Sequence, residues 1–450
     1  MRPKRRNKFS SFFQSIILHL RWFIPGIGVK RWVLLILAGT TMLGVGVAVY
    51  LLDIYRTAPE SWWLPVIKIL ALQFITNRIL RALIFGGLGM ASIVIGIAGL
   101  NRALLSPFMR PGRDVIDTVA EYRRKEKGPR IVVIGGGHGL SSILRGLKAY
   151  TRNITAIVTV ADDGGSSGEI RKSVGILPPG DLRNCLAALS DDEEMMTQLF
   201  QYRFASGAGL NGHSLGNLLI TALTEITGSF EAAIAESAKV LAVQGKVLPT
   251  SLKNITLFGE IEMPNQAGVI EVKGESEIGK ADGRVRRVWL EPANPSSYPP
   301  TIQAILNADL ILVGPGSLYT SIIANLLVPD LVEAINTSRA YKYFICNIAT
   351  QRGETDGYSC EDHLQAIEWH IGTNLFDVVL ANNRFDIRMP EGVQLVKIAG
   401  SDQYRGIYQS DFVDEDNPWR HDPAKIAKTI IDLYMERTGP LASKDETFNN

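Results

Sequence analysis

Two long hydrophobic runs without charged residues stand out in the first quarter of the chain. The first covers residues 32–52 and reads WVLLILAGTTMLGVGVAVYLL, and the second covers residues 82–100 and continues past Arg102 to Leu105. About 20 helical residues cross the roughly 30 Å hydrocarbon layer of a membrane. The runs therefore predict two transmembrane helices, at about 32–52 and 82–105. Buried core helices are the alternative for both, and a signal peptide is the alternative for the first run, although a second span follows it.

After residue 130 the pattern changes to short β-branched runs that alternate with amphipathic helical stretches. Glycines follow the first of these runs directly, and an apolar stretch with helical spacing comes next. This alternation predicts βαβ units and an α/β fold with a mainly parallel sheet, in which ligands bind beyond the carboxyl ends of the strands. The clearest predicted strands are 130–134, 154–160, 310–313, 343–346 and 378–380.

The charge distribution divides the chain into a basic and an acidic part. Residues 1–130 hold 20 Lys and Arg against 6 Asp and Glu, whereas residues 131–450 hold 27 against 39. Basic residues flank the predicted hairpin on its outer sides and are sparse in its connector, which predicts that both termini and the globular domain are cytoplasmic. The expected organisation is a basic N-terminus 1–31, two spans within 32–105, a linker 106–129, a globular domain 130–435 and a flexible tail 436–450.

Composition also limits the kinds of partner and site. The acidic globular part argues against nucleic-acid binding, because phosphate backbones require clustered Lys and Arg. The juxtamembrane Lys and Arg would be attracted to anionic membrane lipid. Cys185, Cys346 and Cys360 form no CxxC pair, so the sequence indicates a reducing compartment and no zinc site.

The first predicted strand leads into a glycine-rich loop within the string IVVIGGGHGLSS. Glycines permit a tight turn and let backbone N–H groups approach phosphate oxygens at a helix N-terminus. The pattern fits the dinucleotide fingerprint only in part, because Leu140 occupies the third glycine position. A purely structural turn is the alternative, and His138 is either a ligand contact or an exposed loop residue. The candidate ligand-binding residues here are Gly135, Gly136, Gly137, His138, Gly139 and Leu140.

Two adjacent carboxylates, Asp162 and Asp163, follow the second predicted strand and precede a Gly/Ser run that includes Ser166. Carboxylates at this edge can hold Mg²⁺ or ribose hydroxyls, and the Gly/Ser run can donate hydrogen bonds to phosphate. A flexible acidic loop is the alternative. Mg²⁺ at Asp162 and Asp163 is the only cofactor that these residues suggest.

Three later motifs have polar residues at predicted helix starts. Arg183 and Asn184 lie in the first turn after Pro178-Pro179-Gly180, and Asn217 follows Gly212-His213-Ser214. Ligand contacts and ordinary capping are equally open for these two motifs, and the adjacent His213 and Ser214 do not form a nucleophile elbow. After the strand at 310–313 the turn repeats the strand–glycine–helix pattern, with candidate ligand-binding residues Gly314, Pro315, Gly316 and Ser317.

Taken together, these motifs resemble the YvcK-type gluconeogenesis-factor family, within the larger CofD-like group. The matching strings occur in order over about residues 130–430, and they include IVVIGGGHGLS, VTVADDGGSSGEIR, LPPGDLRNCLAALS, GHSLGNLL, LILVGPGSLYTSI, CNIATQRGETDGYSCEDHL and NPWRHDPAKIA. The resemblance implies a Rossmann-like three-layer α/β sandwich, here preceded by a transmembrane α-hairpin. The two predicted spans lie outside the common plan of the family.

The resemblance also implies a function. Members of this family bind UDP-sugars, notably UDP-N-acetylglucosamine, and support cell shape and envelope synthesis during growth on gluconeogenic carbon sources. The leading hypothesis is therefore a membrane-tethered, cytosolic UDP-sugar-binding regulator, with cell-envelope synthesis proteins and further copies of itself as candidate partners. Arg420, in the string NPWRHDP, is expected to reach the diphosphate.

Two enzymatic hypotheses remain beside this one. The first is a CofD-like, Mg²⁺-dependent phosphotransferase that uses a nucleotide diphosphate-linked donor, with one carboxylate assisting proton loss from the acceptor hydroxyl. The second is an NAD-dependent dehydrogenase, which the incomplete glycine fingerprint disfavours. Whether the protein turns over a substrate stays open from the sequence.

Overall fold

The computed structural model describes residues 115–438, except 192, 208, 264–267, 282 and 401–405, and scattered positions between 37 and 94. Contacts divide the chain into two compact units, Met1–Arg124 and Lys125–Asn450. The predicted basic N-terminus, most of both predicted spans, their connector and the last twelve residues lie outside the described part. The described positions inside the two hydrophobic runs are helical.

No single helix among the described residues is both long and apolar enough to cross a membrane. A bent pair of helices, Leu318–Leu326 and Pro329–Thr337, passes the same test when its two parts are taken together across a 72° bend. Within the predicted linker, residues Val115–Glu126 form helix α5.

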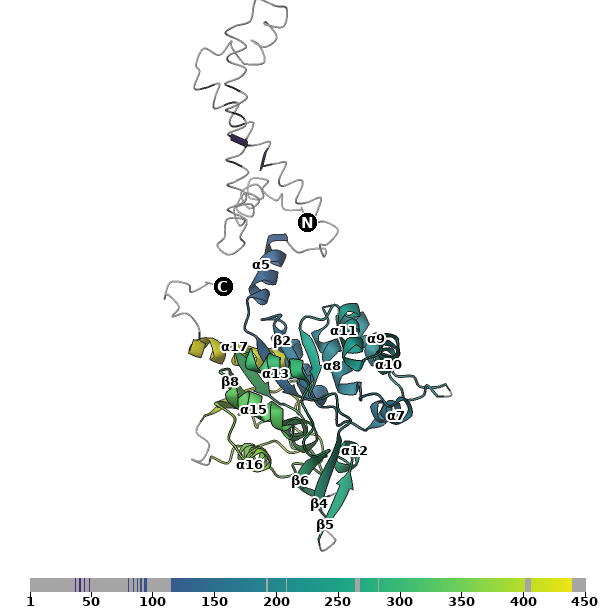
Figure 1. The fold of residues 1–450 in the computed structure, drawn as a ribbon. Helices are drawn as coiled ribbons and strands as arrows, with labels where there is room; N and C mark the ends of the chain where they lie inside the picture. The colour runs from purple at the N-terminus through teal and green to yellow at the C-terminus, as the bar shows by residue number, and fades with distance from the viewer. Residues whose placement is uncertain are drawn as a thin grey trace, which may run out of the picture. The chain divides into compact units, whose positions relative to one another are not determined.

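A seven-stranded parallel sheet forms the centre of the second unit (Figure 1). Its strand order is β10-β9-β8-β7-β1-β2-β3. Strands β1, β7 and β9 are completely buried, as is typical of a parallel sheet that is covered on both faces. The strands are β1 (Ile131–Gly135), β2 (Ile154–Val158), β3 (Lys246–Pro249), β7 (Leu310–Val313), β8 (Tyr341–Ile345), β9 (Val378–Asn382) and β10 (Ile407–Ser410).

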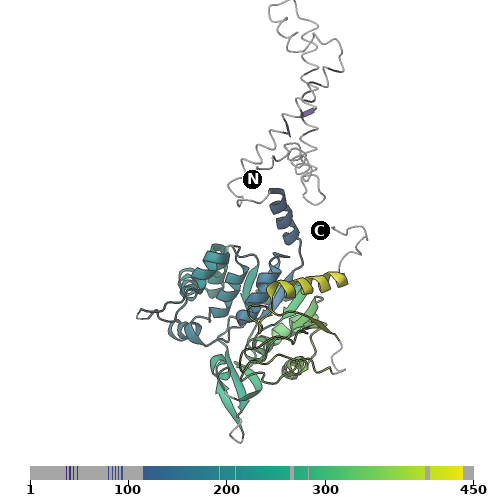
Figure 2. The same cartoon turned by 180° about the vertical axis from the view of Figure 1, so that it is seen from behind.

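Helices cover both faces of this sheet, which confirms the predicted α/β class with a mainly parallel sheet. Helices α13 (Pro299–Leu306) and α15 (Pro329–Thr337) lie in front of it in Figure 1, and α17 (Pro423–Thr438) lies in front when it is seen from behind in Figure 2. Helix α6 (Gly137–Leu147) packs against both α8 (Gly180–Leu189) and α17. The other helices are α7 (Gly165–Val174), α9 (Glu193–Gln201), α10 (Leu215–Thr227), α11 (Phe230–Val240), α12 (Glu275–Ile278), α14 (Ala324–Leu326) and α16 (Cys360–Ile371), with a π-helix η3 (Leu318–Ile323).

A small antiparallel sheet is inserted along the chain between β3 and β7. Strand β4 (Thr256–Glu262) pairs with β5 (Val269–Lys273) on one side and with β6 (Arg284–Glu291) on the other. Buried and more exposed residues alternate along β4, because one face of this sheet packs inward and the other does not.

Candidate functional site

The strand order changes direction at β1, and this determines where a crevice forms. From β1 the chain continues outward to β2 and β3, and it then returns to β7 on the other side of β1. Ligands of open α/β sheets bind at such a switch point, beyond the carboxyl ends of the two strands. The loops that follow β1 and β7 are the two predicted glycine loops, so the structure brings them together.

Two glycines determine the shape of the loop after β1, one through its backbone conformation and the other through a close approach to the second loop. Gly137 has φ +64°, a left-handed conformation that favours glycine. Its backbone N–H donates to Asp181 Oδ2 at 2.8 Å. A Cβ on Gly139 would lie 2.8 Å from the carbonyl oxygen of Pro315, so a side chain there would push the two loops apart. Leu140, at the third fingerprint position, is fully buried and packs in the core.

Amide side chains from later parts of the chain hydrogen-bond the loop after β7 and its surroundings. Gly316 N–H donates to Asn347 Oδ1 at 3.1 Å, and Asn347 Nδ2 donates back to the Gly316 carbonyl oxygen at 2.8 Å. Asn325 Nδ2 donates to the carbonyl oxygen of Gly135 at 2.9 Å and so connects the helix after this loop to the first loop. Gly314 has φ +83° and Ser317 Oγ donates to Gln351. Sequence analysis missed Asn325, Asn347 and Gln351, because nothing local marks an amide that supports a distant loop.

Between the two loops lies a cavity of about 500 Å³. Its lining includes most of the predicted loop residues, namely Gly136, Gly137, His138, Gly139, Pro315, Gly316 and Ser317. The C-terminal segment adds Trp419 and Arg420 to the lining, and a contact between Arg420 and a diphosphate stays a prediction. A second cavity, of about 530 Å³, opens at the amino ends of the central strands, but neither glycine loop reaches it.

His138 lies on the wall of this crevice near positive charges. Partial burial lowers the pKa of His138, and the charges of Arg420, Arg183 and Arg145 lower it further. The imidazole is therefore neutral near pH 7, where it can both donate and accept a hydrogen bond.

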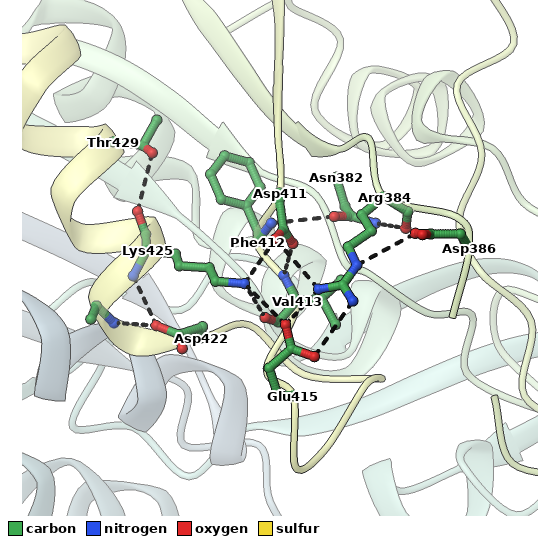
Figure 3. Close-up of polar contacts among 11 residues, drawn as sticks. Asn382, Arg384, Asp386, Asp411, Phe412, Val413, Glu415, Asp422, Lys425 and Thr429 are labelled. Atoms are coloured by element: carbon green, nitrogen blue, oxygen red, sulfur yellow. Dashed lines mark hydrogen bonds and ion pairs between the residues drawn. The ribbon is translucent and has the colours of Figure 1, made fainter. Parts of the chain in front are cut away.

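The C-terminal segment that carries Arg420 is fixed by backbone and ionic contacts (Figure 3). Asp414 N–H donates to the Arg420 carbonyl oxygen at 3.0 Å, and Asp422 N–H donates to that of Phe412 at 2.8 Å. Lys425 Nζ lies 2.8 Å from Asp411 Oδ2, and Arg384 pairs with Glu415. His421, which is buried, hydrogen-bonds the Cys346 carbonyl oxygen at 3.1 Å, and burial lowers the pKa of His421 to about 4.

Asp162 and Asp163 turn toward different neighbours. Asp162 Oδ1 accepts from Gly164 N–H at 2.9 Å, whereas Asp163 Oδ1 accepts from Ser276 N–H at the start of α12. Burial raises the pKa of Asp162, and the charge of Asp163 adds to this. In the described part of the chain, no three His, Cys, Asp or Glu side chains are grouped so that they could hold a metal ion. A metal at these two aspartates would thus need oxygen ligands from elsewhere, and the magnesium site stays a prediction.

Three further acids near this edge were not singled out from the sequence. Burial and the charge of Asp162 raise the pKa of Asp181 to about 6. Burial raises the pKa of Glu275 to about 8, and the charges of Asp162 and Asp181 contribute. Burial likewise raises the pKa of Glu354 to about 7. Such shifts depend on tertiary burial, and the sequence carries no signal for them beyond an Asp at a helix start.

The predicted polar residues Ser166, Asn184 and Asn217 lie outside the lining of the crevice. Asn217 Nδ2 donates to Ser166 Oγ at 3.0 Å, and Ser166 Oγ lies 3.0 Å from His213 Nδ1. Asn184 Oδ1 accepts from Arg183 Nη2 at 2.8 Å. The structure therefore brings Ser166 and Asn217 together but places neither at the glycine loops.

Comparison with known proteins identifies relatives of the whole domain. The family model of 2-phospho-L-lactate transferase CofD matches residues 131–429. A "Gluconeogenesis factor" from Halalkalibacterium halodurans is 47% identical over 316 residues, which cover 68% of this chain and 97% of that protein. A crystal structure of a UPF0052-family protein from Bacillus halodurans has a TM-score of 0.62 and 46% identity, and it covers 67% of this chain and 99% of its own.

A longer relative extends the match toward the N-terminus. A "Putative gluconeogenesis factor" from Nostoc sp. is 43% identical over 435 residues, covering 92% of both chains. Since only about 8% of this chain lies outside that alignment, the match includes most of residues 1–130. The N-terminal region is thus shared with some relatives, whereas the Halalkalibacterium protein aligns over 68% of this chain.

Proposed function

This chain belongs to the CofD family and, within it, to the gluconeogenesis factors, and from this premise we propose that it is a regulator that binds a UDP-sugar, UDP-N-acetylglucosamine in particular. The observation that carries the proposal is the crevice of about 500 Å³ between the loops after β1 and β7. Its volume falls in the range of roughly 300–1,000 Å³ that is typical of small-molecule sites.

The chemistry of the crevice suits a diphosphate. Gly139 and Gly316 have no side chains, so backbone groups can approach phosphate oxygens closely, and α6 begins beside them at Gly137. Arg420 lines the same space and supplies a positive charge. Ser317 and the neutral His138 offer hydrogen bonds to sugar hydroxyls, and Trp419 offers an aromatic face to a base.

Calorimetric titration of UDP-N-acetylglucosamine into the full-length protein tests this proposal. We expect saturable binding, and we expect that Arg420→Gln weakens it about tenfold or more, because a charge-assisted contact to the diphosphate is lost. Arg388→Gln changes an exposed arginine that is absent from the lining and is the matched control. The absence of binding at millimolar ligand would contradict the proposal.

A second candidate function is transfer of a phosphate-containing group, as in the enzyme that names the family. The observation that favours it is Asp181, whose Oδ2 accepts from the Gly137 N–H of the first loop. Because the pKa of Asp181 is raised to about 6, it is a stronger base toward an acceptor hydroxyl than an ordinary carboxylate. Turnover of a nucleotide diphosphate-linked donor that Asp181→Asn abolishes would support transfer, and inertness with every acceptor tried would count against it.

We place the domain at the cytoplasmic face of a membrane. The support is the length of the two uncharged runs and the flanking Lys and Arg. Extraction of cell membranes at alkaline pH should leave the full chain in the pellet, and its release into the supernatant would overturn the assignment. Self-association and contacts with cell-envelope synthesis proteins stay predictions.

A further inference from the structure

Arg183 has a buried guanidinium with two nitrogen atoms that lack hydrogen-bond partners among the described residues. Its exposed fraction is 7%, and within the described part of the chain its Nε and Nη1 have no partner, while Nη2 donates to Asn184. Asn217, 2% exposed, likewise has no partner for its Oδ1. Buried polar groups are nearly always hydrogen-bonded, so unpaired ones call for an explanation.

Both side chains lie where three helices begin. Asn217, in the first turn of α10, donates to Ser166 and lies 3.5 Å from Ser167 Oγ, both in the first turn of α7. A Cβ on Gly180, the first residue of α8, would lie 2.3 Å from Ser167 Oγ. A Cβ on Gly216 would lie 2.7 Å from Arg183 Cδ, which joins α8 to α10.

The first turns of α7 and α8 have backbone donors without a side-chain cap, whereas Ser214 caps α10. Gly164 before α7 and Pro179 before α8 provide no side-chain cap, so the N–H groups that follow are not capped by these residues. Helix N-termini carry partial positive charge and attract anions. Burial lowers the pKa of Arg183 and the charge of Arg203 lowers it further, whereas Asp181 and Asp162 act in the opposite direction.

We propose that Arg183 is the centre of a second, oxyanion-binding subsite, formed where the first turns of α7, α8 and α10 meet, that takes a phosphate or carboxylate group. Ser166 and Ser167 contribute hydroxyls to it, and the unpaired Asn217 Oδ1 accepts from a hydroxyl of the same ligand. Neither Arg183 nor Asn217 is among the residues that line the crevice between the glycine loops, but the charge of Arg183 lowers the pKa of His138 on the crevice wall, so the subsite adjoins the proposed UDP-sugar site. The subsite would bind the anionic group of a second ligand or of an effector.

Equilibrium dialysis with radiolabelled inorganic phosphate tests the subsite in the full-length protein. Saturating UDP-N-acetylglucosamine is present in one arm and absent in the other, so that phosphate held by the glycine loops is recognised by its displacement. We expect one phosphate that UDP-N-acetylglucosamine does not displace. Arg183→Gln should weaken its binding about tenfold or more, since a charge-assisted contact is lost. Arg286→Gln, an exposed arginine on β6, is the matched control and should bind as the wild type does.

Thermal unfolding in the absence of phosphate distinguishes a ligand-binding from a structural role. If Arg183 awaits an anion, Arg183→Gln melts at the same or a higher temperature than the wild type but loses the rise in Tm that phosphate causes. Arg183→Lys, which keeps the charge, should restore part of that rise. Undiminished phosphate binding by Arg183→Gln, or no displacement-resistant phosphate in the wild type, would overturn the proposal. The thermal readout and the comparison of phosphate binding between Arg183→Gln and the wild type do not require that UDP-N-acetylglucosamine binds, so failure of the proposed function would be seen separately.

Discussion

Gly139 marks a close approach between the two loops of the crevice. Its missing side chain is a requirement of packing, because a Cβ would lie 2.8 Å from the Pro315 carbonyl oxygen and 3.0 Å from the Pro315 carbonyl carbon. Backbone atoms of a neighbouring loop cannot rotate away as a flexible side chain can. The width of the crevice is therefore sensitive to a single methyl group at this position.

Substitution of this glycine tests the width directly. Gly139→Ala should lower the affinity for UDP-N-acetylglucosamine about tenfold, because the loops must move apart, and should cost roughly 1–3 kcal/mol of stability through overpacking. Gly279→Ala is the control, since its Cβ would meet only ordinary contacts at 3.7 Å and its φ is −66°. Calorimetry and urea unfolding measure both quantities. Equal affinities for Gly139→Ala and the wild type would show that the loops do not close on the ligand.

Glu354 provides a pH-dependent prediction. It is 2% exposed, it accepts from Thr320 Oγ1 at 3.1 Å, and its pKa is raised from 4.5 to about 7. Between these values the folded protein holds a proton that the unfolded chain releases, so this residue makes stability fall as pH rises through the window. Above about pH 7 the buried carboxylate lowers the free energy of unfolding by its full amount, and below about pH 4.5 this loss of stability is absent.

Glu354→Gln removes this titration. The stability of the variant relative to the wild type should rise by up to roughly 3 kcal/mol as pH increases across the window, given about 1.4 kcal/mol per pKa unit. Urea unfolding at several pH values measures the difference, and Glu291→Gln, on an exposed side chain, is the control. Parallel stability curves for Glu354→Gln and the wild type would contradict the raised pKa.

At the scale of single residues, the sequence predicted most of the loop residues that line the crevice. It did not predict the distant residues that hydrogen-bond those loops. Eight of the predicted residues line the crevice, because glycine after a buried strand is a local signal. Asp181 was not singled out, yet its carboxylate accepts from Gly137, 44 residues earlier in the chain. Such a contact is set by how α8 packs beside α6, and no local pattern encodes it.

Among the elements, the segment between β10 and α17 determines where Arg420 lies. The segment runs from Asp411 to Asp422 and is closed by a bridge between Val413 and His421. Lys425, on the first turns of α17, donates to Asp411 and to the Val413 carbonyl oxygen at 3.0 Å (Figure 3). This one ammonium group therefore ties the beginning of the segment to the helix that follows it.

Lys425→Met should loosen that connection while preserving most of the side chain's apolar contacts. The ion pair is partly exposed, so we expect a loss of only about 0–1 kcal/mol in stability. The affinity for UDP-N-acetylglucosamine should fall roughly fivefold, equivalent to about 1 kcal/mol, because Arg420 is held less firmly. Lys428→Met, an exposed lysine on the same helix, is the control. An affinity equal to that of the control would mean that the backbone contacts alone position Arg420.

The strands show why some elements could be predicted and others could not. The predicted strand 310–313 coincides with β7, and the run at 154–160 contains β2, because buried parallel strands are short β-branched runs. Strand β3 at the sheet edge has four residues and ends at Pro249, and β10 at the other edge is mostly polar. Short or polar edge strands lack the hydrophobic signal, so both were missed, as was the small antiparallel sheet.

For the whole molecule, the comparisons show that the domain occurs among its relatives both with and without a matching N-terminal region. The Bacillus subtilis "Gluconeogenesis factor" aligns over 99% of its own length with 68% of this chain at 44% identity. The described contacts also separate Lys125–Asn450 from the preceding residues. The family and its α/β fold were predicted correctly from the motif strings, whereas the predicted spans lie largely outside the described residues.

A chain of residues 125–450 should therefore fold alone and bind UDP-N-acetylglucosamine as tightly as the full chain does. We expect it in the soluble fraction, while the full chain sediments with membranes, because only the latter carries the two hydrophobic runs. Calorimetry and fractionation measure these properties. Loss of binding in a truncated chain that is folded by circular dichroism would show that the N-terminal region contributes to the site.

The position of β1 between β2 and β7 has a consequence for biosynthesis. The two walls of the crevice, Gly135–Leu140 and Gly314–Ser317, are about 180 residues apart in the chain, although their strands are paired neighbours. At about 5–20 residues per second, a ribosome needs roughly 10–35 s to proceed from one wall to the other. During this interval the first wall emerges without its partner and the edge of β1 is unpaired. A nascent chain thus cannot form the crevice before Ser317 has been synthesised, because one of the two walls is missing until then.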